Sequence, residues 1–114
     1  MTPDDLDDYL RSIGLTVEVL TGADDLSYTV VRNFAIPSGS LVGRGCDVAI
    51  QRPLGDPYVL PSAIHTRPAL LEMGTFNTQQ SPIGPEWQYW SRRMDAPPST
   101  RLIWAHVISA LTEH

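Results

Sequence analysis

Three stretches of the chain alternate apolar and polar side chains, near residues 15–21, 27–36 and 46–52. A period of two is typical of β-strands, because successive side chains point to opposite faces of a sheet. The second stretch mixes apolar and polar residues on both faces, which predicts a central or partly covered strand. Residues 62–65 add a short fourth strand, and turns rich in glycine and proline separate the stretches. The sequence therefore predicts an antiparallel meander sheet of three or four strands.

Helical patterns lie at both ends of these strands. Thr2 and Pro3, followed by two aspartates, form a strong helix start, and a helix near residues 3–13 is predicted. A second helix is predicted near residues 99–112, with a broad apolar face of Leu102, Ile103, Val107, Ile108, Ala110 and Leu111. Residues 69–86 show no period, which predicts an irregular loop of the kind that carries function. This order of elements predicts an α+β domain with helices packed on one sheet.

Length, charge and cysteine content limit the classes of function. The 114 residues are enough for one domain, residues 1–114, with a single core. A net charge of −5 argues against nucleic-acid binding. The acidic start differs from a signal segment, and no apolar run approaches the roughly 20 residues that span a bilayer. We therefore expect a cytoplasmic protein with no membrane partner. A lone Cys46, and a His65 without a second ligand at suitable spacing, predict no metal and no other cofactor.

Residues 84–93 read Gly-Pro-Glu-Trp-Gln-Tyr-Trp-Ser-Arg-Arg and carry the most informative cluster of side chains. Three aromatic residues fall within four positions, next to a serine and two adjacent arginines. Aromatic side chains bury large areas and often keep a polar edge near solvent. The stretch is therefore predicted to wrap a site. The alternative interpretation is a segment of the core that also carries a serine.

Several short motifs resemble those of ubiquitin-conjugating enzymes. Asp56-Pro57-Tyr58-Val59-Leu60-Pro61 resembles the Tyr-Pro-x-x-Pro-Pro element of that family, and Trp90-Ser91 resembles its Trp-Ser-Pro. Trp87-Gln88-Tyr89-Trp90-Ser91-Arg92 is similar to the Trp-x-x-Trp-Ser-Arg-His motif of a small bacterial group of such proteins. That group lies beside multi-ubiquitin-like proteins, activating enzymes and isopeptidases. The resemblance implies the ubiquitin-conjugating-enzyme fold, with an irregular active-site loop before the last helix. It also implies two partners, a ubiquitin-like protein and its activating enzyme.

The chain departs from that family at its catalytic residues. The His-Pro-Asn tripeptide is missing, and Asn77 is the nearest asparagine to its place. The expected position of the catalytic cysteine falls on Ser81, whereas Cys46 alternates with apolar neighbours, which favours a core residue. The resemblance therefore implies a serine oxyester rather than a cysteine thioester. Ser91 is the first candidate because it matches the bacterial motif, and Ser81 is the second because of its spacing.

The same resemblance suggests roles for the residues near the serine. Arg92 or Arg93 is expected to stabilise the oxyanion of the acyl-transfer intermediate, and Trp87 and Trp90 are expected to contact a partner. Conjugating enzymes present their first helix to the activating enzyme, so the face with Asp4, Asp7, Asp8 and Arg11 is expected to dock there. The alternative is an ordinary solvated helix face. For the whole chain, the alternative is a catalytically inactive module that binds a ubiquitin-like protein or its activating enzyme.

Overall fold

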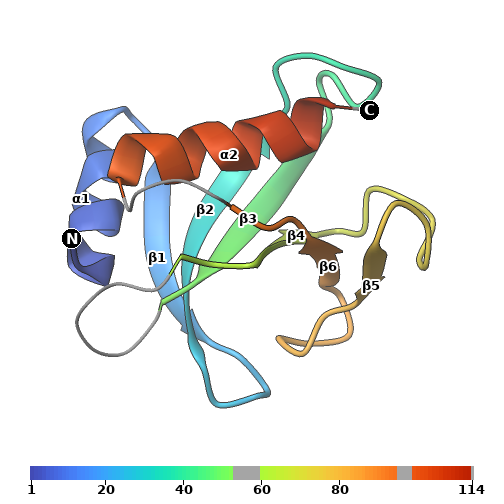
Figure 1. The fold of residues 1–114 in the computed structure, drawn as a ribbon, viewed down its shortest axis with the longest axis horizontal. Helices are drawn as coiled ribbons and strands as arrows, with labels where there is room; N and C mark the ends of the chain where they lie inside the picture. Colours follow the sequence, from blue (N-terminus) through green and yellow to red (C-terminus); the bar gives the residue numbers. More distant parts are fainter. Residues whose placement is uncertain (53–59, 95–98, 114) are drawn as a thin grey trace.

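The computed structural model describes residues 1–52, 60–94 and 99–113 of the chain. Two helices flank six strands (Figure 1). In chain order the elements are α1 (Pro3–Ser12), β1 (Thr16–Thr21), β2 (Ser27–Ala35), β3 (Gly45–Gln51), β4 (Ala63–Arg67), β5 (Thr78–Gln80), β6 (Gln88–Ser91) and α2 (Thr100–Thr112). Residues 56–59 of the motif at 56–61 lie outside the described residues.

All six strands form one antiparallel sheet in the order β1-β2-β3-β4-β6-β5. The α+β class, the antiparallel meander and both helices are confirmed, but the sheet has six strands where three or four were predicted. The predicted irregular loop contains β5, and the aromatic stretch forms β6. These two strands have three and four residues, which is too short for a period of two to be recognised in the sequence.

Both helices pack on the same face of the sheet and enclose the larger core (Figure 1). The buried stripe of α2 consists of Ile103, Trp104, Val107, Ala110 and Leu111, which recur at helical spacing. Leu102 was predicted in that stripe and is instead 37% exposed, because its neighbours at 103 and 104 point to the sheet. None of the helices in the described part of the chain is long and apolar enough to cross a membrane.

The opposite face of β2 and β3 is covered by the segment between β5 and β6. Ile83 and Trp87 from this segment pack against Tyr28, Val30 and Ala49. This second cluster explains why β2 has apolar residues on both faces. Gly22 allows the β1–β2 turn to close onto the covering segment, because a Cβ there would lie 3.2 Å from Ile83 Cα. The amide of Ala23 donates to the Ile83 carbonyl at 2.9 Å and fixes this contact.

A buried ion pair joins α1 to the sheet. Asp7 is 3% exposed, and its carboxylate accepts hydrogen bonds from Arg52 and from the Thr29 hydroxyl. Arg52 also donates to Asp4 at 2.8 Å. The prediction that Asp7 belongs to an exposed docking face is therefore wrong. Asp7 lies beside the buried Leu6 on the helix surface and faces β2.

This ion pair leads to a prediction about stability. Asp7→Ala removes the carboxylate and leaves Arg52 with an incompletely paired charge at the edge of the core. We expect the free energy of unfolding to fall by about 3 kcal/mol, the lower end of the range for breaking a buried pair, because Arg52 keeps its hydrogen bond to Asp4. Asp8→Ala is the matched control, because that side chain is 78% exposed and changes of this kind cost less than about 0.5 kcal/mol. Urea denaturation measures both, and equal losses would contradict the assignment.

Candidate functional site

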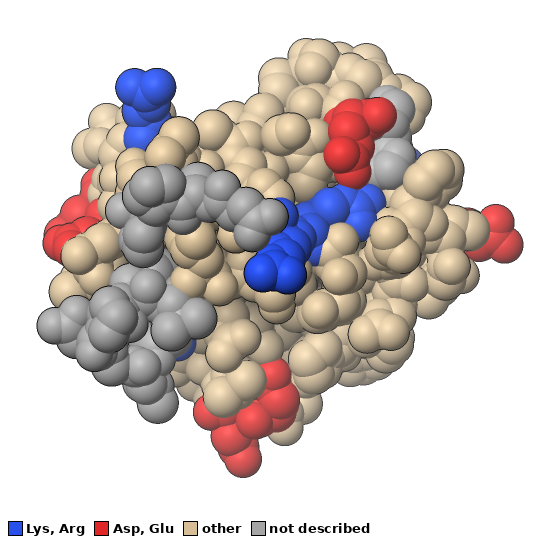
Figure 2. Space-filling model, in the orientation of Figure 1, with Lys and Arg blue, Asp and Glu red and all other residues tan. Residues whose placement is uncertain are grey.

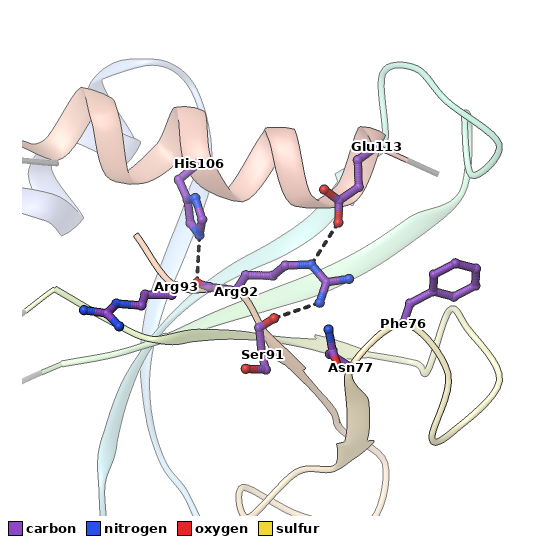
Figure 3. Close-up of a pocket in the computed structure, with 7 residues that line it drawn as sticks. All are labelled: Phe76, Asn77, Ser91, Arg92, Arg93, His106 and Glu113. Carbon is purple, nitrogen blue, oxygen red and sulfur yellow. Dashed lines mark hydrogen bonds and ion pairs between the residues drawn. The ribbon is translucent and has the colours of Figure 1, made fainter. Parts of the chain in front are cut away.

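An open pocket of about 580 Å³ lies between the end of β6 and α2. Six of its seven lining side chains are polar or charged and one is aromatic, and Figure 3 shows them: Phe76, Asn77, Ser91, Arg92, Arg93, His106 and Glu113. The turn before β5 supplies the first two, the end of β6 and the residues after it supply the next three, and α2 and its C-cap supply the last two. On this face of the molecule, basic side chains gather near its centre beside an acidic group (Figure 2).

The alternation of β6 directs Ser91 outward. Trp90 is fully buried, and its indole Nε1 donates to the Thr66 hydroxyl at 3.0 Å. Ser91, the next residue, is exposed and lines the pocket. The Ser91 amide donates to the Asn77 carbonyl at 3.0 Å, and the Arg92 amide donates to the Ser62 carbonyl at 3.0 Å. Because both backbone donors next to Ser91 are occupied, an oxyanion on Ser91 would depend on side-chain donors.

Arg92 holds the pocket together. Its Nη1 donates to the Ser91 carbonyl at 2.8 Å, and its Nε donates to Glu113 at 2.9 Å. The guanidinium also lies 5.4 Å from the centre of the Trp90 ring. These contacts leave only 11% of the side chain exposed and tie the end of α2 to β6. Figure 3 shows the Asn77 side chain directed toward the same space.

His106 is a pocket residue that the sequence did not reveal. Its Nε2 lies 2.9 Å from the Arg92 carbonyl, and a carbonyl can only accept, so Nε2 carries a proton. In the described part of the chain, no imidazole or carboxylate is hydrogen-bonded to Ser91 Oγ. The pocket therefore offers an exposed hydroxyl and two guanidinium groups without a base in contact with that hydroxyl. Such a set of donors suits a carboxylate or another anionic group.

The second candidate serine lies in a different environment. Ser81 is 4% exposed, and its Oγ accepts from the Ile83 amide at 3.1 Å and lies 2.8 Å from His65 Nδ1. A buried hydroxyl with these partners is not accessible to a macromolecular acyl donor. The spacing to the expected cysteine position, which made Ser81 a candidate, therefore pointed to a buried residue. Cys46 is likewise buried, and burial raises the pKa of its thiol to about 11, which disfavours the nucleophilic thiolate.

The two tryptophans also belong to the interior. Trp87 and Trp90 are 2% and 0% exposed, and the Arg67 guanidinium lies 4.5 Å from the centre of the Trp87 ring. The burial of both rings contradicts the prediction that they contact a partner. For these two residues, the alternative interpretation of the aromatic stretch as a segment of the core is the correct one. On α1, Asp8 and Arg11 are exposed, and Arg11 Nη1 lies 3.7 Å from Asp8 Oδ1. These two residues remain as the candidate docking residues.

Comparison of the chain with protein-family models, with curated proteins and with solved structures gave no match. Within residues 1–52, 60–94 and 99–113, no group of three or more histidine, cysteine, aspartate or glutamate side chains is placed to hold a metal ion.

The buried His65 predicts a pH dependence of stability. Burial lowers the pKa of His65 from its ordinary value of 6.5 to about 4, and nearby Asp24 only partly opposes this shift. The unfolded chain binds a proton at this residue below pH 6.5, and the folded chain does so only near pH 4. Stability should therefore fall as the pH is lowered between these values, by roughly 1 kcal/mol per pH unit. Denaturation of the parent and of His65→Gln from pH 7 to pH 5 tests this. The variant should lose the slope, whereas His106→Gln should retain it.

Proposed function

We propose that the chain is a carrier in a ubiquitin-like conjugation pathway and that Ser91 accepts the C-terminus of the modifier as an oxyester. The observation that carries this proposal is the position of Ser91, which is exposed in an open, arginine-lined pocket directly after the buried Trp90. An extended C-terminal tail can enter an open pocket of this size, and its terminal carbonyl would lie among hydrogen-bond donors. The motif around Ser91 supports the same proposal through its resemblance to the bacterial group.

The arrangement of elements supports the proposed family. A first helix, an antiparallel meander and a last helix follow one another in the order of the ubiquitin-conjugating-enzyme fold. The chain differs from that fold where β6 and β5 extend the sheet in place of the irregular loop. In the proposed carrier, the acyl acceptor is therefore held at the end of a strand.

The proposed reaction is an acyl transfer from the activating enzyme. Ser91 Oγ forms a bond to the terminal carbonyl carbon of the modifier, the thioester bond to the activating enzyme breaks, and the hydroxyl proton passes to the departing thiolate. In this proposal Arg92 or Arg93, with Asn77 beside them in the pocket lining, would stabilise the oxyanion, because the neighbouring backbone amides are occupied. A serine hydroxyl requires activation, so the partner would supply the base that Ser91 lacks in the described chain. Asp8 and Arg11 on α1 are the proposed contact for that partner.

A second candidate is a module that binds the modifier without forming a bond. The position of His106 favours it, because the Nε2 of this imidazole is engaged by the Arg92 carbonyl. In that case the two arginines bind the terminal carboxylate directly. The two candidates place the same tail in the same pocket and differ in whether a covalent adduct forms.

The distinguishing experiment mixes the chain with the activating enzyme, ATP and the ubiquitin-like protein, and mass spectrometry then detects the adduct. An oxyester survives thiol reductant and is cleaved by mild base. The chain contains no lysine, so an amide on its own side chains cannot imitate the ester. Ser91→Ala should abolish the adduct, Ser40→Ala is the matched exposed control, and Ser91→Cys should make the adduct sensitive to reductant.

Each outcome decides between the candidates. An adduct lost only in Ser91→Ala supports the carrier. Tight binding of the modifier without an adduct supports the binding module, and Arg93→Ala should then weaken binding about tenfold by removing a charge-assisted contact. Absence of both adduct and binding rejects the proposed function.

A further inference from the structure

A second, smaller pocket lies on the face of the sheet that the helices do not cover. Its volume is about 120 Å³, and its polar lining includes Asp24, Tyr28, His65 and Tyr89. Leu26 and Pro82 add apolar walls. None of these residues lines the Ser91 pocket. The space is well below the roughly 300 Å³ at which drug-sized ligand sites begin, so the pocket suits a single small functional group.

A chain of hydrogen bonds builds this pocket. The Ala23 amide bonds to the Ile83 carbonyl, the Ile83 amide bonds to Ser81 Oγ, and Ser81 Oγ bonds to His65 Nδ1 at 2.8 Å. On the other side, the Tyr28 hydroxyl donates to Asp24 at 2.6 Å. The turn with Asp24 is thereby fixed relative to the imidazole of His65. The edges of the Tyr28 and Tyr89 rings meet the imidazole at centroid distances of 5.2 and 5.3 Å and hold its plane.

The hydrogen bonds around Ser81 favour one of the two neutral tautomers of His65. Ser81 Oγ already accepts the Ile83 amide, and within the described residues His65 Nδ1 is the acceptor placed to receive the Ser81 hydroxyl proton. Nδ1 is then unprotonated, and the proton of the neutral imidazole lies on Nε2. The His65 residue is only 3% exposed. Its Nε2 has no hydrogen-bond partner among the described residues. His65 lines the pocket, and in this tautomer its one N–H donor is Nε2.

Asp24 supplies the complementary acceptor. Its two carboxylate oxygens accept from the Leu26 amide at 3.1 Å and from the Tyr28 hydroxyl. A carboxylate has about four acceptor positions, so it can accept further hydrogen bonds from a ligand. Its charge also disfavours an anionic ligand in so small a space.

We propose that this pocket binds a carboxamide group, with the amide oxygen on His65 Nε2 and the amide nitrogen donating to Asp24. A carboxamide is neutral, planar and small, and it carries both an acceptor and a donor. The Tyr28 and Tyr89 rings and Pro82 line the same space. Such a group can belong to a glutamine or asparagine side chain of a partner protein, or to a free small molecule. The site is independent of Ser91 and does not rest on the proposed conjugation function.

The first test uses the unaltered protein. Nitrogen-15 NMR of the histidine side chains at pH 7 should show His65 protonated at Nε2, and an Nδ1-protonated ring overturns the proposal. Propionamide is then titrated against propionate, which has the same shape but is anionic and lacks the donor. We expect saturable shifts at His65 and Tyr89 with propionamide and at least tenfold weaker binding of propionate. Equal binding of the two, or no saturable shift with propionamide, overturns the proposal.

Variants and a second ligand complete the test. Asp24→Asn should weaken propionamide binding about tenfold by removing a charge-assisted hydrogen bond, whereas Asp25→Asn in the same turn should leave it unchanged. Equal effects of the two variants contradict the assigned role of Asp24. N-acetylglutamine methylamide distinguishes the sources: tighter binding than propionamide assigns the site to a partner's glutamine side chain, and weaker binding assigns it to a free small carboxamide.

Discussion

The pairing of β6 with β4 is the constraint on which the rest of the structure depends. It places Trp90 opposite Ile64, within the core under the helices, and leaves Ser91 at the end of the strand. Gln88, on the same strand, is fully buried, and its side-chain amide bonds to the Leu70 amide and the Leu71 carbonyl at 3.0 and 2.9 Å. One strand of four residues therefore organises the core, the segment after β4 and the pocket. Its displacement would also expose Trp87, because that ring covers β2 and β3 from the other face.

Arginine side chains connect elements that the backbone hydrogen bonds do not join. Arg52 ties α1 to the sheet through Asp7, and Arg92 ties the end of α2 to β6 through Glu113. Both guanidinium groups are largely buried, and a planar group with several donors can serve two partners at once. In the Ser91 pocket this structural use limits what Arg92 can offer a ligand. The exposed Arg93 is then the arginine best placed to meet an incoming tail, and Arg92 shapes the wall against which that tail would lie.

Local patterns in the sequence predicted α1, β1, β2, β3 and α2, because each of these elements contains enough residues to show its period. The short strand predicted at residues 62–65 corresponds to β4. β6 was missed because its identity depends on pairing with β4, and β5 was missed because its identity depends on pairing with β6; no short pattern in the sequence records either pairing. The same reason accounts for Asp7, whose partner Arg52 is 45 positions away in the chain. Ser91 and Arg92 were found from a motif, whereas His106 and Glu113 reach the pocket only through the packing of α2. The lining of a site by distant elements is a property of tertiary structure.

The two candidate serines show how the fold assigns different roles to similar residues. Ser81 and Ser91 both lie near tryptophan in the sequence, yet one hydroxyl is enclosed by Ile83 and His65 and the other faces an open pocket. A buried hydroxyl that bonds to an imidazole holds the orientation of that ring. An exposed hydroxyl without such a bond is accessible and depends on a partner for activation. In the two proposals, Ser81 therefore acts by positioning His65 beside the smaller pocket, whereas Ser91 is the one of these two serines that an acyl donor can reach.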